Sequence, residues 1–378
     1  MASAEEGVLP PSNVEAGSAR RTAHHPFVAN IQTLRFVAAA FILVNHVQHE
    51  VHDLGIQPGF VRWTPIIWSI GVDIFFVISG FMMYLLMNEG AGKPGAARYF
   101  LLRRFVRVVP SYWLFTTLML LAIFLFSGSV SQQTPTITEV ITSYSFVPWP
   151  QESGAMRPVL ALGWTLNYEI FFYLACALSM LHSRGTAILA GGLILLTMLS
   201  PLVPDLFVLR FWTDPIILDF VAGLALGKLY LGGNRITPLA AAALIASAVA
   251  VSLAIANARI GLALPRPIAL GVPALMICAA FALSPDFFGN GPVGRAIRVA
   301  GDASYALYLS HPFTIAIIAI CWKPLAPADP LSFVIVASAG GIAVSVLLHQ
   351  ALEKPWLRFA RLRLNAIDHR RALRTEAL

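Results

Sequence analysis

The stretch IQTLRFVAAAFILVNHVQHE, residues 31–50, decides the fold of this chain. It is long and apolar enough to span a membrane as one helix, yet it carries Arg35 near its start and His46 near its end. Eleven residues complete about three helical turns, so both side chains share one face, about 16 Å apart along the axis. An ionisable side chain at the bilayer centre costs at least ~2.5 kcal/mol and usually faces protein or a wet cavity. We therefore expect this face to line a path. The alternative is that Arg35 snorkels to the headgroups and His46 bonds a neighbouring helix.

The composition excludes a soluble domain. Hydrophobic residues make up 57% of the 378 positions and charged residues only 12%, whereas soluble proteins carry about 25% charged residues. The chain is therefore expected to be an all-α, polytopic membrane protein. Its net charge of +7 lies in loops between apolar segments, which is typical of membrane topology and not of nucleic-acid binding. Cys176, Cys278 and Cys321 stand singly in apolar runs, which predicts neither a disulfide framework nor a metal site.

The hydropathy pattern predicts about ten transmembrane helices with both termini cytoplasmic. If the N-terminus lies inside, the loops with most Lys and Arg all fall on the cytoplasmic side. An odd number of helices would instead force the basic C-terminal tail outside. The apolar segments cover residues 31–50, 66–87, 108–127, 162–181, 186–203, 212–231, 237–256, 267–284, 303–322 and 332–352.

No repeat or long linker divides the chain, so a single membrane domain is expected over residues 31–360. Residues 1–30 lack both a hydrophobic face and the organisation of a signal peptide, and we expect a disordered cytoplasmic tail there. Residues 361–378 are expected to form a basic cytoplasmic tail. The longest external connection, 127–162, is either a lid over the outer mouth of a cavity or a simple connection.

Two carboxylates enter the expected membrane core from the outer side. Asp73, in the stretch GVDIFFVISG, lies about two turns into the segment 66–87, and Glu169 lies about two turns into its own segment, after Trp164 and Asn167. His46 is near the outer end of its helix, so all three ionisable groups are expected in the outer half of the membrane, where they could form one site. A carboxylate that holds a neutral imidazole makes it a competent general base. The alternative is that both carboxylates pair structurally with neighbouring helices.

Three arginines stand at the cytoplasmic entrance of the third segment, in RYFLLRRFVRVV: Arg103, Arg104 and Arg107. Arg104 and Arg107 are three residues apart and so share one helical face. Guanidinium groups at this spacing suit the phosphate oxygens of a nucleotide-bearing cosubstrate. The alternative is a positive-inside cluster that attracts anionic lipid.

The ninth segment carries Ser310, His311 and Pro312 in its interior. The proline interrupts the helical hydrogen bonds, and we expect the polar pair to face inward, with His311 as a second candidate titrating group. The sequence contains no GxSxG, Walker, HExxH or dinucleotide-binding motif, so it does not indicate the chemistries of soluble enzymes.

Together these stretches resemble the acyltransferase 3 family of integral membrane acyltransferases, which includes bacterial O-antigen and exopolysaccharide acetylases. The resemblance covers about residues 31–360, and the exopolysaccharide acetylases are the group that it most resembles. In the family's order, the stretches are LRFVAAAFILVNH, GVDIFFVISGFMMYLL, RYFLLRRFVRVVPSYWL, GWTLNYEIFFYL, SYALYLSHP and EKPWLR.

The resemblance implies a multi-pass protein of the inner (plasma) membrane that transfers an acyl group to a sugar hydroxyl. The donor would be cytoplasmic acyl-CoA, most often acetyl-CoA, and the acceptor a surface polysaccharide or its lipid-linked precursor. The resemblance matches Arg35 and His46 to the family's arginine and histidine, which lie eleven residues apart. It matches Glu169 to the family's intramembrane acidic position. The family's arginine pair corresponds to Arg104 and Arg107. Expected partners are membrane lipid, acyl-CoA and carbohydrate, with no metal or nucleic acid, and a homo-oligomer is left open.

We therefore expect His46 to act as the general base on the acceptor hydroxyl, with Asp73 or Glu169 orienting its imidazole. The CoA phosphates are expected at Arg103, Arg104 and Arg107, and the thioester arm is expected to pass Arg35. Direct transfer and an acyl-histidine intermediate both remain open. The rival class is a polytopic transporter or flippase that uses intramembrane His, Asp and Glu as a relay.

Overall fold

The computed structural model describes residues 29–53, 60–90, 93–126, 134–151, 154–203, 207–258, 260, 264–322 and 329–364. Throughout these ranges the regular elements are helices, which confirms the all-α fold class. Residues 1–28 and 365–378, and with them most of both expected tails, lie outside the described residues.

The helices follow one another along the chain as α1 (Ala29–Asp53), α2 (Pro65–Gly90), α3 (Ala96–Leu125), α4 (Ile137–Tyr144), α5 (Trp164–Ser179), α6 (Gly185–Met198), α7 (Phe207–Trp212), α8 (Ile217–Leu231), α9 (Pro238–Asn257), α10 (Val272–Leu283), α11 (Pro292–Asp302), α12 (Ser304–Trp322) and α13 (Pro330–Leu348). Short 3₁₀ turns cover Ala161–Gly163 and Ser200–Leu202, and π-helical turns cover Pro267–Gly271 and His349–Glu353. After the second π turn the helix of α13 continues to Leu364.

Each of the ten expected apolar segments coincides with a helix. The largest difference is α3, which begins at Ala96 and therefore includes the basic stretch before the apolar segment. This stretch is helical because its apolar side chains are buried, as at Phe100 and Val108, while its arginines face a cavity.

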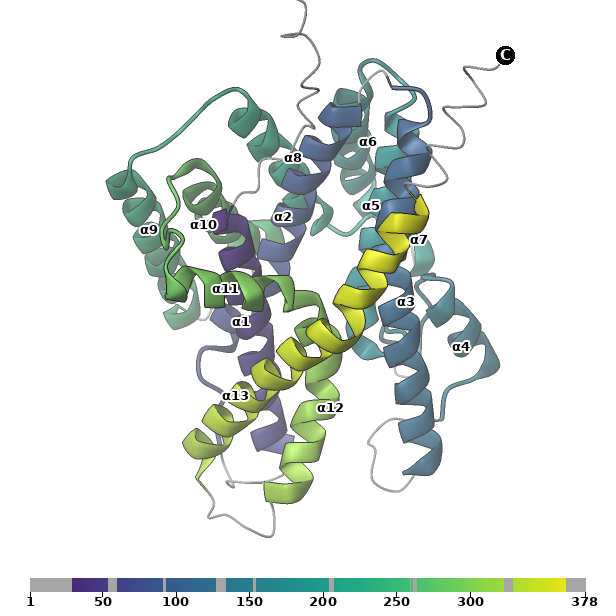
Figure 1. The fold of residues 1–378 in the computed structure, drawn as a ribbon, viewed down its shortest axis with the longest axis vertical. Coiled ribbons are helices and arrows are strands. Elements are labelled where there is room, and N and C mark those ends of the chain that lie inside the picture. The colour runs from purple at the N-terminus through teal and green to yellow at the C-terminus, as the bar shows by residue number, and fades with distance from the viewer. Residues whose placement is uncertain are drawn as a thin grey trace, which may run out of the picture.

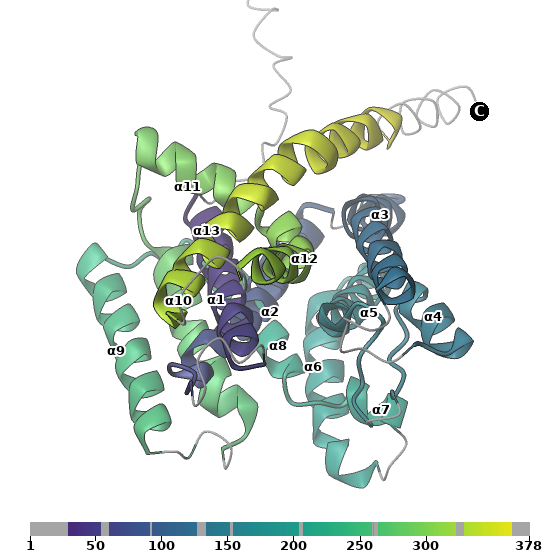
Figure 2. The ribbon, with the colours of Figure 1, turned by 90° about the horizontal axis from the view of Figure 1, so that it is seen from below.

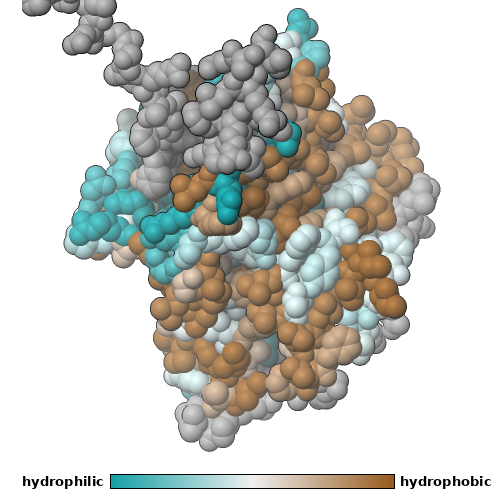
Figure 3. Space-filling view, turned by 45° about the vertical axis from the view of Figure 1, so that its right-hand side comes forward, coloured by the Kyte–Doolittle hydropathy of each residue, from teal (hydrophilic) through white to brown (hydrophobic). Residues whose placement is uncertain are grey.

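Six helices of the described ranges are long and apolar enough to cross a membrane, judged by length and composition: Ile67–Gly90, Ala96–Leu125, Ala161–Ser179, Pro238–Asn257, Ser304–Trp322 and Pro330–Leu364. Figure 3 shows a molecular face that is mostly hydrophobic, with hydrophilic residues gathered along one side. These features support a multi-pass membrane protein. The count of about ten spans and the cytoplasmic termini remain predictions.

The helices form two groups that meet along α2 and α8. Figure 2 shows α3 to α7 on one side and α9 and α10 on the other, with α2, α8 and α12 between them. At the contact, a Cβ atom at Gly80 would overlap the carbonyl oxygen of Phe220, and one at Gly223 would overlap that of Val77. Gly223 and Gly227 form a GxxxG pair, the spacing that lets membrane helices approach closely.

The helix α1 lies inside the bundle and contacts α2, α10, α11, α12 and α13. Figure 1 shows α11 lying across α1 at a large angle. The small residue Ala38 of α1 is fully buried, and Gly71 of α2 lies against its carbonyl oxygen. The central position of α1 explains why a helix with polar residues is retained in an apolar protein, since its polar face is enclosed by other helices.

A proline in α3 connects that helix to the end of the chain. Pro110 has no N–H, so the carbonyl oxygen of Val106, four residues earlier, loses its helical donor. The indole nitrogen of Trp356 donates to this oxygen at 3.0 Å. In Figure 1 the helix of α13 accordingly crosses the bundle obliquely toward α3.

The close approach of α2 and α8 gives a stability prediction. In Gly80→Ala the new methyl group meets the rigid backbone of α8, and overpacking of this kind destabilises by about 1–3 kcal/mol. The thermal unfolding temperature in detergent should fall. The matched control is Gly191→Ala in α6, where a Cβ meets no atom within 4 Å and stability should be unchanged or slightly higher. Equal unfolding temperatures for the two variants would contradict the described helix contact.

Candidate functional site

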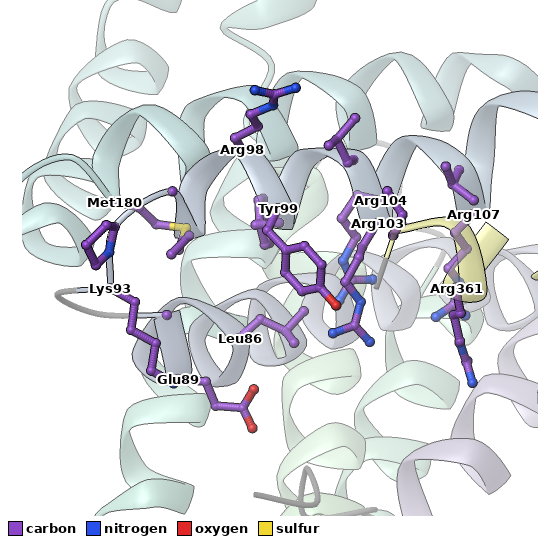
Figure 4. A pocket seen from close by; sticks show the side chains of 18 of the residues that line it. Leu86, Glu89, Lys93, Arg98, Tyr99, Arg103, Arg104, Arg107, Met180 and Arg361 are labelled. Carbon is purple, nitrogen blue, oxygen red and sulfur yellow. The ribbon is translucent and has the colours of Figure 1, made fainter. Parts of the chain in front are cut away.

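A basic cavity opens where α2 ends and α3 begins. This arginine basin has a volume of about 600 Å³ and is lined by the end of α2, the first turns of α3 and the extension of α13. Figure 4 shows the side chains of Arg103 and Arg104 close together beside the ring of Tyr99, with Arg107 and Arg361 next to them. The guanidinium carbon of Arg103 lies 5.4 Å from the centre of the Tyr99 ring. Several guanidinium groups around one space form a site for phosphate oxygens.

A second cavity, the inner cavity, has a volume of about 170 Å³ and lies among α1, α2, α3, α5 and α12. Arg104 and Arg107 line both cavities, so the basin and the inner cavity adjoin at these two side chains. The other polar residues that line the inner cavity are Gln32, Arg35, Ser79, Thr165, Glu169, Ser304, Tyr305 and Tyr308. The arginines of α1 and α3 thus line adjoining cavities from different helices.

The inner cavity carries more positive than negative charge. Among the described residues that line it, the carboxylate is that of Glu169 of α5, and the other acidic neighbours of Arg35 are Asp302 of α11 and Glu353 of the second π turn. Glu169 accepts a hydrogen bond from the Tyr173 hydroxyl, and Glu353 accepts one from Nδ1 of His349 at 2.8 Å. The arginines are Arg35, Arg104 and Arg107. In the described lining of the cavity, three guanidinium groups against one carboxylate favour an anionic ligand.

The inner cavity ends close to a pair of histidines. His46 of α1 and His311 of α12 pack edge to face, with ring centroids 5.0 Å apart and ring planes at 69°. The cavity wall includes Ile42, one turn before His46, and Tyr308, one turn before His311. A ligand that extends along this cavity therefore approaches the histidine pair.

Tyr308 is held in a fixed position at that end of the cavity. Its hydroxyl donates to the carbonyl oxygen of Leu162 at 2.8 Å and lies 2.7 Å from the Thr165 hydroxyl. These contacts join α12 to the start of α5. The hydroxyl of Tyr305, one turn earlier, donates to the Val108 carbonyl at 2.8 Å and joins α12 to α3.

Asp73 lies in a different place from the one expected from its depth in the membrane. It is fully buried, and Arg266 binds it with two hydrogen bonds, Nε to Oδ1 at 3.0 Å and Nη2 to Oδ2 at 2.8 Å. Asp219 of α8 lies beside it, in space that Gly271 leaves free. Among the described residues this ion pair joins α2 to the π turn before α10, and it does not involve His46.

Glu169 lines the inner cavity and accepts a hydrogen bond from the Tyr173 hydroxyl. In the described residues, Asp73 and Glu169 thus have partners other than His46. The sequence placed the three groups at similar depth but could not define the direction in which each side chain points. His46 has His311 as its ring neighbour instead of a carboxylate.

Of the remaining expected residues, Asn167 and Ser310 are buried and Trp164 is half-buried. Trp164 packs on Tyr168 with ring centroids 6.1 Å apart. The Asn167 side chain is buried and has no hydrogen-bond partner among the described residues, and the same holds for the Ser310 hydroxyl. None of these three residues lines the inner cavity.

Sequence reasoning missed several residues that the structure brings to the site. Arg361 had been assigned to a basic tail, yet it lines the basin. His349, at the end of the last apolar segment, forms a pair with Glu353 that is buried near Arg35. The sequence signal for this pair was the presence of two ionisable residues, His349 and Glu353, four positions apart at the end of an apolar segment.

The external connection 127–162 packs on α3 through the part that the structure describes. The indole nitrogen of Trp113 donates to the Tyr144 carbonyl at 3.0 Å, and Thr117 lies 2.6 Å from the Tyr144 hydroxyl. Helix α4 begins with a capping box, in which the side chains of Thr136 and Glu139 each accept a hydrogen bond from the backbone N–H of the other residue. Residues 127–133 and 152–153 lie outside the described residues, so the alternative between lid and connection stays open.

Comparisons of the sequence with known proteins found similarities to a family and to a curated protein. A family model described as "Acyltransferase domain", of the acyltransferase 3 type, matches residues 28–350. The chain is 34% identical over 305 residues to the "Exopolysaccharide production protein ExoZ" of Rhizobium meliloti (strain 1021), covering 79% of this chain and 92% of that protein. No solved structure matches the chain.

Proposed function

The chain belongs to the acyltransferase 3 family of membrane acyltransferases, and from that premise we propose that it is an O-acyltransferase of the inner membrane. It moves an acetyl group from cytoplasmic acetyl-CoA to a hydroxyl of an exopolysaccharide or of its lipid-linked precursor. The observation that carries this proposal is the pair of adjoining cavities, which share Arg104 and Arg107 and end one turn from His46 and His311. The similarity to an exopolysaccharide production protein supports the class of acceptor.

The two cavities differ in size in the way that a CoA thioester requires. The arginine basin, at about 600 Å³, falls within the range of ~300–1,000 Å³ that accommodates ligands of nucleotide size. The inner cavity, at about 170 Å³, is too small for a nucleotide and suits a narrow chain. We place the phosphates at Arg103, Arg104 and Arg107, and the thioester arm in the inner cavity beside Arg35.

His46 acts as the general base in the reaction. The acceptor oxygen forms a bond with the thioester carbonyl carbon while the imidazole of His46 takes the hydroxyl proton. The C–S bond then breaks, and the CoA thiolate receives that proton from the imidazolium. Glu169 holds Arg35 and Arg104 in place as their counter-charge, which separates its role from that of the base. Transfer through an acyl-histidine is the alternative order of steps.

The proposed topology has about ten spans and both termini in the cytoplasm. It places the arginine basin on the cytoplasmic side, where acyl-CoA is present, and His46 in the outer half of the membrane. Donor and acceptor then enter from opposite sides and meet near the histidine pair.

Oriented membrane vesicles test both the reaction and its sidedness. Inverted vesicles that contain the protein should transfer label from radioactive acetyl-CoA to carbohydrate, because their exposed face is cytoplasmic. Right-side-out vesicles should transfer none, since acetyl-CoA does not cross the membrane. Movement of a lipid-linked saccharide across the membrane without transfer of label would indicate a flippase, and transfer in right-side-out vesicles alone would reverse the topology.

The arginine pair predicts a donor-specific defect. Arg104→Ala and Arg107→Ala should raise the KM for acetyl-CoA by about tenfold or more each, because each removes a charge-assisted hydrogen bond worth ~1.5–3 kcal/mol. The control is Arg235→Ala, which removes an arginine that stacks on Tyr230 away from both cavities. If folded Arg104 and Arg107 variants keep the wild-type KM for acetyl-CoA, the arginine cluster does not bind the donor and reflects only the membrane topology.

We expect substitution of His46 to lower turnover and to leave donor binding unchanged. His46→Ala should lose about 10²–10⁴-fold in kcat, the usual contribution of a general base, while it still binds acetyl-CoA. His46→Gln should fail equally, because an amide does not accept the proton at neutral pH. His182→Ala, at an exposed histidine outside both cavities, is the control. Near-normal transfer by His46→Ala would remove His46 from the mechanism.

A further inference from the structure

The second histidine, His311, is buried in an arrangement that defines its hydrogen-bonding state. Its side chain is 1% exposed, and Nδ1 lies 3.0 Å from the Leu307 carbonyl oxygen. A carbonyl only accepts hydrogen bonds, so Nδ1 carries the hydrogen and a neutral ring carries its lone pair on Nε2. No described residue donates to that Nε2. The ring therefore presents one unused acceptor inside the protein.

The surrounding helix keeps this acceptor in place. Pro312 follows His311 and has no N–H, so the Tyr308 carbonyl loses its helical donor directly beneath the histidine ring. Tyr308 is itself anchored to Leu162 and Thr165, and its ring centroid lies 6.3 Å from that of His311. A buried polar atom without a partner costs about 1–3 kcal/mol, so its retention in a packed helix points to a use.

Among the described residues, each carboxylate that was expected beside His46 has another partner. Asp73 is bound by Arg266, and Glu169 by Tyr173, in the described structure. The other ionisable neighbours of His46 are His49, three residues along α1, and Arg157, whose side chain has no acceptor atom. The ring that packs against His46 is that of His311, at 5.0 Å between centroids.

We propose that His311 is the positioning residue for His46, and this proposal rests on the proposed acyltransferase function. Nε2 of His311 accepts a hydrogen bond from one ring N–H of His46, so the other ring nitrogen of His46 presents its lone pair to the acceptor hydroxyl. An N–H···N bond of about 2.9 Å between two imidazoles needs ring centres about 5 Å apart, which the pair already satisfies. A rotation of the His46 ring completes the contact.

His311 neither gains nor loses a proton or a covalent bond in the proposed reaction. The proton of the acceptor hydroxyl moves to the free nitrogen of His46 as the C–O bond forms. The imidazolium of His46 is stabilised because its other N–H is bonded to His311, which stays neutral throughout. When the C–S bond breaks, the thiolate receives the proton from His46. His311 thus occupies the place that a carboxylate takes in other base-orienting pairs.

The test compares variants at His311 that differ in the ability to accept a hydrogen bond. His311→Gln keeps an acceptor atom, whereas His311→Leu and His311→Phe have none. We expect kcat of the Leu and Phe variants to fall by about 10–100-fold, the value of one hydrogen bond to a charged group, with the KM for acetyl-CoA unchanged. The Gln variant should retain most of the turnover. The control is Thr314→Val, which alters a buried polar residue one turn along α12.

A double-variant cycle separates positioning from a merely structural role. In the His46→Ala background, His311→Leu should cause no further loss, because His311 acts through His46. Equal turnover of His311→Leu and wild type would overturn the inference, as would equal losses in the Gln and Leu variants together with lower thermal stability. An additional loss in the His46→Ala background would assign His311 an independent role and also overturn it. Full activity of His46→Ala would instead refute the proposed mechanism itself.

Discussion

The burial of three guanidinium groups inside an apolar bundle is the constraint on which the rest of this structure depends. A charge in an apolar membrane interior costs at least ~2.5 kcal/mol unless it meets counter-charges or a polar cavity. The acidic neighbours of the arginines of α1 and α3 are Glu169 from α5, Asp302 from α11 and Glu353 from the extension of α13, so helices from distant parts of the sequence converge around them. The inner cavity lies at this convergence.

Tight packing elsewhere supports this open region. The contact of α2 with α8 depends on Gly80 and Gly223, where backbone meets backbone and no space remains. Prolines inside helices have the opposite effect, because they release carbonyl oxygens for tertiary contacts. Pro110 releases the Val106 carbonyl, which then binds Trp356 and brings the last helix to the rim of the arginine basin. The basin therefore combines residues that are more than two hundred positions apart in the sequence.

The two carboxylates Asp73 and Glu169 show how depth and direction differ. Asp73 and Glu169 occur at similar distances into their helices, and their similar depth was the reason to expect both near His46. Rotation about the helix axis decides where each side chain points. Asp73 turns toward Arg266, while Glu169 turns toward the arginines of the inner cavity. The second histidine, which belongs to α12 and so lies seven helices after Glu169 of α5 in the chain, takes the position beside His46 that a carboxylate had been expected to fill.

The sequence by itself determined the class of the fold, the existence and approximate limits of the ten apolar helices, the family, and the placement of Arg35, Arg104 and Arg107 on faces that line a cavity. These properties are local, because apolar length, helical spacing and single motifs are readable along one segment. Only the tertiary structure decided that Arg266 neutralises Asp73 and that His311 meets His46, and only it brought Arg361 to the basin. These contacts depend on the rotation and crossing of helices, which follow from packing across the whole bundle and not from any one segment.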